Sequence, residues 1–288
     1  MSDSPAGPIV LVTGATDGIG RATALALSAR GATVLVHGRS AERARPVVDA
    51  LRAQGAARPD FAAEPFVADL ARLADVRALA DRVGERVPRL DVLVNNAGVA
   101  FRGAERHAST DGFELTMAVN HLAHWLLTER LRPLMERRDV GAPPARVVTV
   151  ASELHARGAI DWEDVGGRHP ERYRGGGAAH AASKLANVLF ARALARRADP
   201  ATLVSHALHP GVIRTKLLRD GFGSNGGATV ERGAATTVEV ALGEAAGRTT
   251  GGYWADARPA EPAAASRDDA AGDRLWAGSA AVLAPWMA

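Results

Sequence analysis

The 288-residue sequence contains no cysteine, and this absence excludes several classes of protein at once. Without cysteine the chain cannot be a disulfide scaffold, a zinc protein with thiolate ligands or a thiol enzyme. It also has no uninterrupted apolar run of about 18 residues, the length that a membrane-spanning helix needs. The first residues, MSDSPAGPIV, carry an acid where a secretory signal would carry positive charge. We therefore expect a cytoplasmic protein that does not cross a membrane.

Lysine is almost absent as well. Of the 35 basic residues only Lys184 and Lys216 are lysines, and the rest are arginines interleaved with Asp and Glu. The formal net charge is only +3, which does not predict a nucleic-acid-binding surface. With 47% hydrophobic and 23% charged residues, the composition is that of a globular protein with ample material for a core.

Short apolar runs alternate with longer amphipathic segments along the chain. Predicted strands cover residues 9–13, 33–37, 65–68, 91–95, 146–151 and 203–208. Predicted helices cover residues 19–30, 41–53, 73–87, 112–137 and 181–197. Apolar strands separated by helices indicate a parallel sheet that is covered on both faces. The pattern predicts an α/β protein with one domain over residues 1–288, a doubly wound parallel sheet of the Rossmann type. We expect residues 1–7 to form a flexible tail and residues 214–232 to form a glycine-rich lid loop over the substrate.

A glycine-rich segment, TGATDGIG at residues 13–20, follows the first predicted strand and precedes a predicted helix. Glycines allow a tight turn and let the backbone and the helix N-terminus approach a pyrophosphate. An ordinary glycine-rich turn is the alternative, but the strand before and the helix after favour dinucleotide binding. The residues expected to contact the cofactor here are Gly14, Thr16, Asp17, Gly18, Ile19 and Gly20.

The end of the second predicted strand bears on which dinucleotide is bound. It reads His37-Gly38-Arg39 and lacks the acid that binds the ribose 2′-hydroxyl of NAD. Arg39 suits a 2′-phosphate, so NADP(H) is favoured over NAD(H). A solvent-facing arginine is the alternative reading of Arg39.

Later motifs extend the pattern, and with them the chain resembles the short-chain dehydrogenase/reductases. In addition to Gly14, Gly18 and Gly20, the matching segments are Asp69-Leu70, Asn95-Asn96-Ala97-Gly98, Asn120, Ser152 and Pro210-Gly211-Val212-Ile213-Arg214-Thr215. Residues 113–127, 183–189 and 274–276 look most like the retinol-dehydrogenase-like branch. The resemblance runs from about Gly7 to Trp276, which is nearly the whole chain.

This resemblance implies roles for individual residues. Asp69 would bind the adenine amine, and Thr215 would contact the carboxamide and pyrophosphate. Asn95, with Ala97 and Gly98, would lie beside the adenine ribose and support the central strand. The further implied cofactor contacts are Leu70, Asn96, Ala97, Gly98, Pro210, Gly211 and Val212. Ser152 would bind the substrate carbonyl and Lys184 the nicotinamide ribose. Asn120 would hold a water molecule in a proton relay, and His155 and Tyr173 would line the substrate pocket.

The sequence departs from the family at its central acid/base, a tyrosine four residues before the lysine. That position is His180, and neither tyrosine of the chain, Tyr173 or Tyr253, has the required spacing. On a helix His180 and Lys184 share a face. Imidazole is a common acid/base, but a nearby lysine and an oxidised nicotinamide should lower its pKa. A neutral imidazole can still polarise a carbonyl. Alternatively, His180 only packs and the substrate supplies its own acid.

We thus expect catalysis by Asn120, Ser152, His180 and Lys184 on a small-molecule substrate. The predicted reaction is NADP(H)-dependent hydride transfer to a ketone or aldehyde, or from a secondary alcohol, with a bulky apolar substrate. The alternatives are a non-redox enzyme on the same fold (a cyclase, dehydratase or epimerase) and an NADP(H)-sensing binding protein. The histidines are dispersed, so no metal site is expected. The resemblance implies a homo-oligomer, and the helices at residues 117–134 and 181–194 are apolar enough to join copies.

Overall fold

All six predicted strands are present in the computed structural model, which describes residues 7–54 and 60–287. Apart from Gly7, the tail predicted at residues 1–7 lies outside the described residues. The strands are β1 (Ile9–Val12), β2 (Thr33–Gly38), β3 (Phe66–Val67), β4 (Val92–Asn95), β5 (Ala145–Val150), β6 (Leu203–His209), β7 (Tyr253–Ala255) and β8 (Arg258–Ala260). They form one sheet in the order β3-β2-β1-β4-β5-β6-β7-β8, parallel except for the antiparallel pair β7–β8. The predicted single-domain α/β fold is therefore confirmed.

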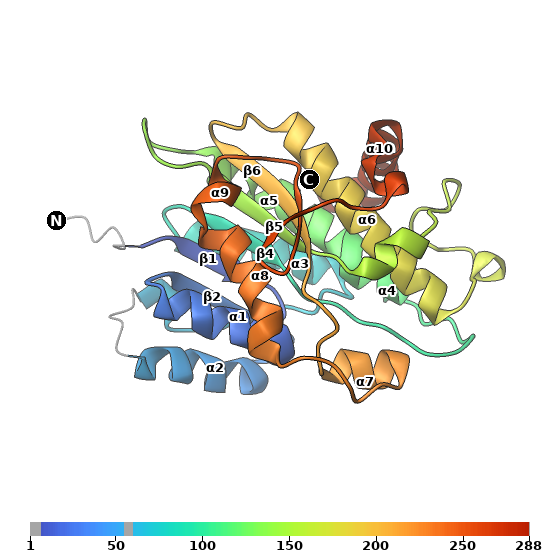
Figure 1. Ribbon diagram of the computed structural model, residues 1–288, viewed down its shortest axis with the longest axis horizontal. Helices are drawn as coiled ribbons and strands as arrows, with labels where there is room; N and C mark the ends of the chain where they lie inside the picture. Colours follow the sequence, from blue (N-terminus) through green and yellow to red (C-terminus); the bar gives the residue numbers. More distant parts are fainter. Residues whose placement is uncertain (1–6, 55–59, 288) are drawn as a thin grey trace.

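Helices cover both faces of this sheet (Figure 1). They are α1 (Gly18–Ala29), α2 (Ala41–Ala53), α3 (Leu73–Arg86), α4 (Leu115–Met117), α5 (Ala123–Glu136), α6 (Gly176–Arg197), α7 (Lys216–Phe222), α8 (Val230–Leu242), α9 (Glu244–Gly247) and α10 (Asp269–Met287). Of the two large core clusters among the described residues, one joins the sheet to α1, α2 and α8, and the other joins it to α3, α5, α6 and α10. A small third cluster packs α6 against β6 and β7.

The strands alternate between the two clusters, as the two-residue period of a β-strand requires. Ile9 and Leu11 belong to one cluster, whereas Val10 and Val12 belong to the other. All four are fully buried, so both faces of this strand lie in the core and favour apolar residues. This explains why continuous apolar runs predicted the strands so closely.

The strand order reverses at β1, which lies between β2 and β4. In an open parallel sheet, the loops at the carboxyl ends of two such strands diverge and leave a crevice for a ligand. The loops after β1 and β4 begin with Thr13 and Asn96. The topology therefore puts the glycine-rich loop at this crevice.

Two predicted boundaries were wrong. Helix α6 begins at Gly176, not at residue 181, because Gly175 adopts φ +92° as the N-cap and the chain turns directly into the helix. A Cβ on Gly176 would lie 2.0 Å from the carbonyl oxygen of Phe101, so only glycine fits there. The segment 214–232, expected as a glycine-rich loop, contains α7 and the first turn of α8.

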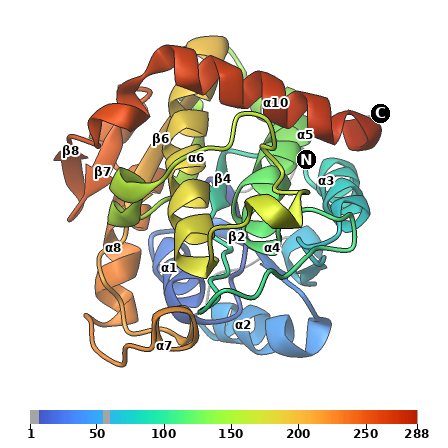
Figure 2. The same ribbon diagram turned by 90° about the vertical axis from the view of Figure 1, so that its right-hand side faces the viewer.

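The C-terminal helix α10 packs across α5 and α6 (Figure 2). The Trp276 ring stacks 5.9 Å from Phe190 on α6 and lies edge-on, 5.3 Å from Trp125 on α5. Arg196 on α6 binds the carboxylate of Asp269 at 2.6 Å. These two helices were the expected contact surface between copies, but here α10 of the same chain packs against them.

Candidate active site

The glycine-rich loop after β1 has the conformation that its sequence predicts. Gly14 and Gly18 have φ of +64° and +51°, a region that side chains with a Cβ rarely adopt. A Cβ on Gly20 would lie 2.2 Å from the carbonyl oxygen of Gly14, so the start of α1 approaches the loop too closely for any other residue. The Asp17 carboxylate accepts a hydrogen bond from the Gly18 N–H at 2.7 Å and caps α1. This loop fits a dinucleotide pyrophosphate, because its backbone and a helix N-terminus are exposed without side chains in the way.

Thr13 holds this loop to the loop after β4, a role that the sequence analysis did not assign. Its buried hydroxyl accepts hydrogen bonds from the N–H groups of Asn96 and Ala97, at 2.9 and 3.0 Å. The Asn96 side chain returns a bond to the carbonyl oxygen of Thr13 at 2.7 Å. Asn95, in contrast, is fully buried and donates to the Thr128 hydroxyl at 3.0 Å, so it supports β4 from inside the core.

Arg39 lies at the same edge of the sheet. A Cβ on the preceding Gly38 would lie 2.3 Å from the methyl group of Thr16, so the ends of β2 and the glycine-rich loop are in contact. The Arg39 side chain is exposed. His37, just before, accepts a hydrogen bond from the Gly14 N–H at 3.1 Å through Nδ1, and burial lowers its pKa to about 4. His37 is therefore neutral and holds the glycine-rich loop through this hydrogen bond. At the end of β2 the positive charge is that of Arg39, not of His37.

The remaining predicted cofactor contacts surround the crevice. The Asp69 carboxylate accepts a hydrogen bond from the Ala71 N–H at 3.0 Å, and Leu70 is buried beside it. Gly211 has φ +92° after Pro210, which turns the chain away from β6. Thr215 caps α7, and its methyl group lies 3.4 Å from the position of a Cβ on Gly18. The segment after β6 thus meets the glycine-rich loop at Thr215, while Val212 is half-exposed.

Asn120 lies in a π-helical turn, Ala118–Leu122, between α4 and α5. Turns of this kind often occur at functional sites. Its side chain accepts a hydrogen bond from the Val99 N–H at 2.8 Å and donates to the Val99 carbonyl oxygen at 3.0 Å. It also donates to the hydroxyl of Ser183 on α6 at 3.0 Å. Asn120 therefore joins the loop after β4, which contains Ala97 and Gly98, to the helix that carries Lys184.

Lys184 is buried under the end of β5. Its Nζ donates to the carbonyl oxygen of Val150 at 2.9 Å, and the side chain of Asn187 donates to the same oxygen at 3.2 Å. Burial lowers the pKa of Lys184 to about 8, still high enough for a cation at neutral pH. Since Ser152 follows Val150 by two residues, this contact fixes Lys184 against the strand end that presents the serine.

His180 lies one helical turn before Lys184 and is also buried. Its Nδ1 lies 3.4 Å from the carbonyl oxygen of Val99, and its ring is edge-on to Phe222 of α7 at 5.2 Å. Burial and the charge of Lys184 lower the pKa of His180 to about 3. The carbonyl can only accept, so Nδ1 carries the proton of the neutral ring and Nε2 presents a lone pair. Phe222 is a further residue of this site that the sequence analysis did not single out.

Ser152 begins the 3-10 turn Glu153–Arg157, and its hydroxyl accepts a hydrogen bond from the Leu154 N–H at 3.2 Å. His155, one turn later, was expected to line the substrate pocket. Its buried ring is 2.6 Å from the carbonyl oxygen of Ser152 and accepts from the Ala263 N–H at 3.0 Å. Both ring nitrogens therefore have backbone partners, and His155 ties the serine turn to the segment before α10.

The two tyrosines occupy different surroundings from His180. Tyr173 is half-buried, two residues before the N-cap Gly175, and burial and Glu114 raise its pKa. Tyr253 lies in β7, against the ring of His155 at 5.0 Å, and burial raises its pKa to about 12.

The described residues contain no cluster of three or more His, Asp or Glu side chains that could hold a metal ion. No helix in this part of the chain is long and apolar enough to cross a membrane. Ser152, Lys184, His180 and Asn120 thus bring a hydroxyl, a buried cation, a neutral imidazole and a carboxamide to the carboxyl edge of the sheet, beside a loop that fits a dinucleotide.

A family model, curated relatives and solved structures all relate this chain to the short chain dehydrogenases. Residues 8–163 match the family model described as short chain dehydrogenase. The chain is 39% identical over 284 residues to DnrU of Streptomyces sp. strain C5, a protein named as a daunorubicin C-13 ketoreductase, covering 96% of this chain and 93% of DnrU. It is 36% identical to retinol dehydrogenase 14 of Mus musculus, covering 94% and 84%. The Pseudomonas aeruginosa RhlG structure in complex with NADP is similar, with a TM-score of 0.69 and 27% identity over 87% of this chain and 94% of that one.

Proposed function

Because the chain belongs to the short-chain dehydrogenase/reductase family, in its retinol-dehydrogenase-like branch, we propose that it is an NADP(H)-dependent oxidoreductase of a ketone or aldehyde and the corresponding alcohol. The observation that carries the proposal is the position of Lys184, fixed through Val150 against the strand end that presents Ser152. A buried lysine in that place, in a chain whose other basic residues are arginines apart from Lys216, supports a catalytic role.

NADPH, when bound, supplies a hydride from its nicotinamide ring. Gly14, Gly18 and Gly20 would accommodate its pyrophosphate, and Arg39 would bind the 2′-phosphate. Lys184 would bind the nicotinamide ribose. These assignments are consistent with the resemblance to a protein that was solved with NADP.

Ser152 would donate a hydrogen bond to the carbonyl oxygen as negative charge develops there. His180 would not be a protonated acid near neutral pH, because its pKa is about 3. In its neutral form its Nε2 lone pair would accept a hydrogen bond from a hydroxyl of the substrate or from water. A water molecule held in this way keeps a second O–H, and we propose that this O–H delivers the proton to the oxyanion in reduction. The hydroxide that remains takes up a proton from bulk solvent, and His180 acts by positioning the water.

A bulky apolar substrate is favoured by the surroundings of α7. Of the exposed large hydrophobic side chains in the described residues, Val212 precedes this helix and Phe222 is its last residue, with its ring edge-on to that of His180. Exposed apolar groups beside a polar site are typical of a binding surface. The relatives named for ketoreduction and for retinol are consistent with such a substrate.

A second function is favoured by one specific observation, the low pKa of His180. Without a ready acid, the site could retain NADP(H) and catalyse a non-redox step such as cyclisation, dehydration or epimerisation. A protein that binds NADP(H) only as a sensor would have no turnover at all. In both alternatives the glycine-rich loop still binds the dinucleotide, but, unlike an oxidoreductase, the protein does not consume NADPH.

The deciding experiment follows NADPH oxidation at 340 nm with a panel of bulky ketones. Wild type, His180→Ala, and His180→Gln are compared, the last retaining a polar side chain. Turnover in the wild type supports the oxidoreductase. We expect His180→Ala to lower kcat by about tenfold, less than the loss of a true general acid, and His180→Gln to recover part of it.

No oxidation across the panel, together with tight NADPH binding, would instead favour the non-redox or sensing function. Product formation from a substrate without NADPH consumption separates these two. We further propose that the protein is cytoplasmic and self-associates through a face other than that covered by α10. Light scattering that gives only the 30.0 kDa monomer would contradict self-association.

A further inference from the structure

His124 is a buried residue of α5 that has no part in the chemistry described so far. Its side chain is 1% exposed and lies between Thr13, directly after β1, and Asn120 in the π-helical turn. Nδ1 is 3.0 Å from the carbonyl oxygen of Asn120, and Nε2 is 3.3 Å from the hydroxyl oxygen of Thr13. Thr13 and His124 are 111 positions apart in the sequence. The imidazole therefore connects the glycine-rich loop to the turn that carries Asn120.

The Asn120 carbonyl determines which nitrogen of His124 carries the proton. A carbonyl oxygen only accepts hydrogen bonds, so Nδ1 is protonated and donates to it. Burial and the charge of Lys184 lower the pKa of His124 to about 3, so the ring is neutral near physiological pH. Nε2 therefore presents a lone pair toward the Thr13 hydroxyl, and this contact requires the hydroxyl to donate.

The Thr13 hydroxyl has its proton available for Nε2. Its oxygen accepts hydrogen bonds from the N–H groups of Asn96 and Ala97, which occupy its two lone pairs. The competing acceptor is the carbonyl oxygen of Val94, 3.1 Å away. That oxygen already accepts from the N–H of Thr13 and shares the N–H of Asn96, at 3.0 Å each. The lone pair of Nε2 is therefore the better acceptor for the hydroxyl proton.

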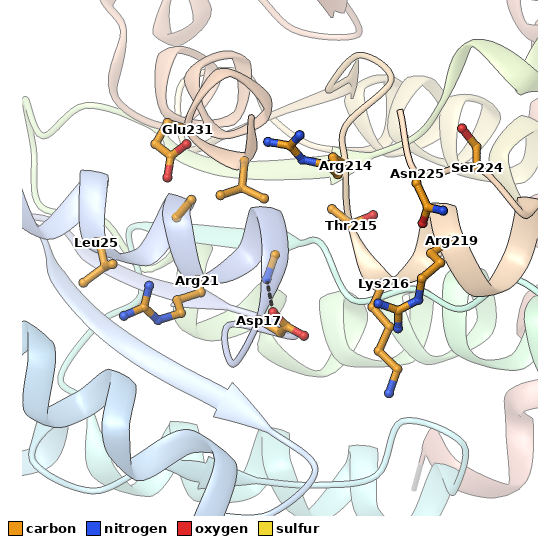
Figure 3. Close-up of a pocket in the computed structure, with 13 residues that line it drawn as sticks. Asp17, Arg21, Leu25, Arg214, Thr215, Lys216, Arg219, Ser224, Asn225 and Glu231 are labelled. Atoms are coloured by element: carbon orange, nitrogen blue, oxygen red, sulfur yellow. Dashed lines mark hydrogen bonds between the residues drawn. The ribbon is translucent and has the colours of Figure 1, made fainter. Parts of the chain in front are cut away.

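The glycine-rich loop is held at both of its ends. At the helix end, the Asp17 carboxylate accepts from the Gly18 N–H at 2.7 Å, on the surface of the protein (Figure 3). At the strand end, Thr13 is fully buried, and its hydroxyl keeps its direction only if a buried acceptor takes its proton. Loss of the His124 ring would leave this hydroxyl free to turn, and the loop after β4 that it holds would lose its fixed position.

The other end of the hydrogen-bond chain reaches α6. The Asn120 side chain donates to the Ser183 hydroxyl at 3.0 Å, and this hydroxyl donates to the carbonyl oxygen of His180 at 2.8 Å. Lys184 follows on the same helix. In a buried chain of this kind each hydrogen bond polarises the next, so the loss of one member weakens the others. The imidazole of His124 is thus the member that joins the glycine-rich loop to the helix of the proposed catalytic residues.

We propose that His124 is a positioning residue for the hydride transfer, which holds the glycine-rich loop and the turn that contains Asn120 in one fixed arrangement. This inference rests on the proposed function. His124 acts through Thr13 and Asn120, and it takes up no proton in the reaction. A displacement of about 1 Å between reacting groups can lower a rate by up to about 100-fold. Two hydrogen bonds away from the reacting atoms can therefore control kcat.

The test compares variants that remove one or both contacts of His124. His124→Phe keeps an aromatic ring but has no nitrogen, whereas the amide of His124→Asn can take the place of Nδ1 and does not reach Thr13. Thr13→Val replaces the hydroxyl with a methyl group and is also combined with His124→Asn. His121→Phe is the matched control, because His121 is equally buried three residues earlier and contacts Ser279 of α10 instead. Urea unfolding checks that each variant is folded.

We expect His124→Phe to lower kcat for NADPH oxidation with a bulky ketone by about tenfold or more, and to raise the dissociation constant for NADPH. His124→Asn should lose less. In the Thr13→Val background, His124→Asn should cause no further loss, because the partner of Nε2 is already absent. The midpoint of the alkaline pH dependence, set by Lys184 with its pKa of about 8, should not move. His121→Phe should lower the free energy of unfolding but keep the kcat and NADPH affinity of the wild type.

NMR of the wild-type protein with isotope-labelled histidine tests the hydrogen-bond chain without NADPH. The signal of His124 is assigned by its loss in His124→Asn. At neutral pH it should show an uncharged ring that is protonated at Nδ1. Protonation at Nε2 would overturn the inference, because Nδ1 would then have no proton for the Asn120 carbonyl.

Unchanged kcat and NADPH binding in folded His124→Phe would overturn the inference and leave the proposed function intact. Equal losses of activity in His124→Phe and His121→Phe would also overturn it, because the loss of either buried histidine would then have the same effect. Wild-type protein that neither binds nor oxidises NADPH would contradict the proposed function. In that event, the protonated nitrogen found by NMR still decides whether His124 joins Thr13 to Asn120, so the two failures are distinguishable.

Discussion

His180 and Lys184 lie one turn apart on α6, and each directs a nitrogen to a backbone carbonyl oxygen of a different strand end. Nδ1 of His180 lies 3.4 Å from Val99 and Nζ of Lys184 lies 2.9 Å from Val150. The helix therefore bridges the loops that follow β4 and β5. Since both side chains are buried together, the lysine charge and the loss of water keep the imidazole neutral.

An alkaline limb in the pH–rate profile should report Lys184. Burial lowers its pKa to about 8, so the ammonium loses its charge as the pH rises above that value. With saturating NADPH, we expect the rate to fall by about tenfold per pH unit above that pKa. Lys184→Met should be nearly inactive at every pH. A wild-type rate that stays constant to about pH 10 would show that the charge of Lys184 is not needed.

Ser152→Ala should separate catalysis from cofactor binding. The substitution removes a hydroxyl that is expected to stabilise the oxyanion, so kcat should fall by about 100-fold. The dissociation constant for NADPH should not change, because the proposed cofactor contacts lie elsewhere. Ser152→Thr, which keeps a hydroxyl, should retain more activity. Stopped-flow kinetics and fluorescence titration measure the two quantities, and loss of NADPH binding in Ser152→Ala would contradict this division.

Two adjacent glycines at the start of α6, Gly176 and Gly177, should respond oppositely to substitution by alanine. A Cβ on Gly176 would overlap the Phe101 carbonyl, so Gly176→Ala should lower the free energy of unfolding by about 2 kcal/mol and disturb the position of His180. Gly177 has nothing within 4 Å of its Cβ position. Gly177→Ala should therefore be neutral or stabilise by up to about 1 kcal/mol. Urea unfolding of both variants tests this, and equal effects would contradict the close approach at Gly176.

Buried histidines should make the protein sensitive to acid. Burial lowers the pKa of His37 and His121 to about 4 and that of His124 and His180 to about 3. These histidines bind protons near pH 6.5 in the unfolded chain but stay neutral at that pH in the folded chain. Their contribution to the free energy of unfolding is therefore fully present above about pH 6.5 and is lost as the pH falls toward 4.

At about pH 5, each of these histidines should lower the free energy of unfolding by on the order of 2 kcal/mol relative to neutral pH. Urea unfolding at two pH values measures the loss. His121→Asn should reduce the pH dependence, whereas the exposed His169→Asn should leave it unchanged. Equal stability of the wild type at about pH 7 and pH 5 would disagree with burial of these rings as neutral groups.

Local sequence determined the strands, the glycine-rich loop and the place of the site. Parallel strands that are buried on both faces are built largely from apolar residues, and a backbone at φ +64° favours glycine, so both features are recognisable in the sequence alone. The spacing of His180 and Lys184 likewise predicted a shared helical face. These features depend on neighbours within one element.

Only the tertiary structure decided what surrounds those residues. The sequence could not show that Phe222 lies against His180, that both nitrogens of His155 have backbone partners, or that α10 covers α5 and α6, because each contact joins segments far apart in the chain. The same is true of Thr13 and His124, whose side chains the fold brings within 3.3 Å of each other. Burial, and with it the neutral state of His180, depends on packing from several elements at once, and no local pattern encodes it.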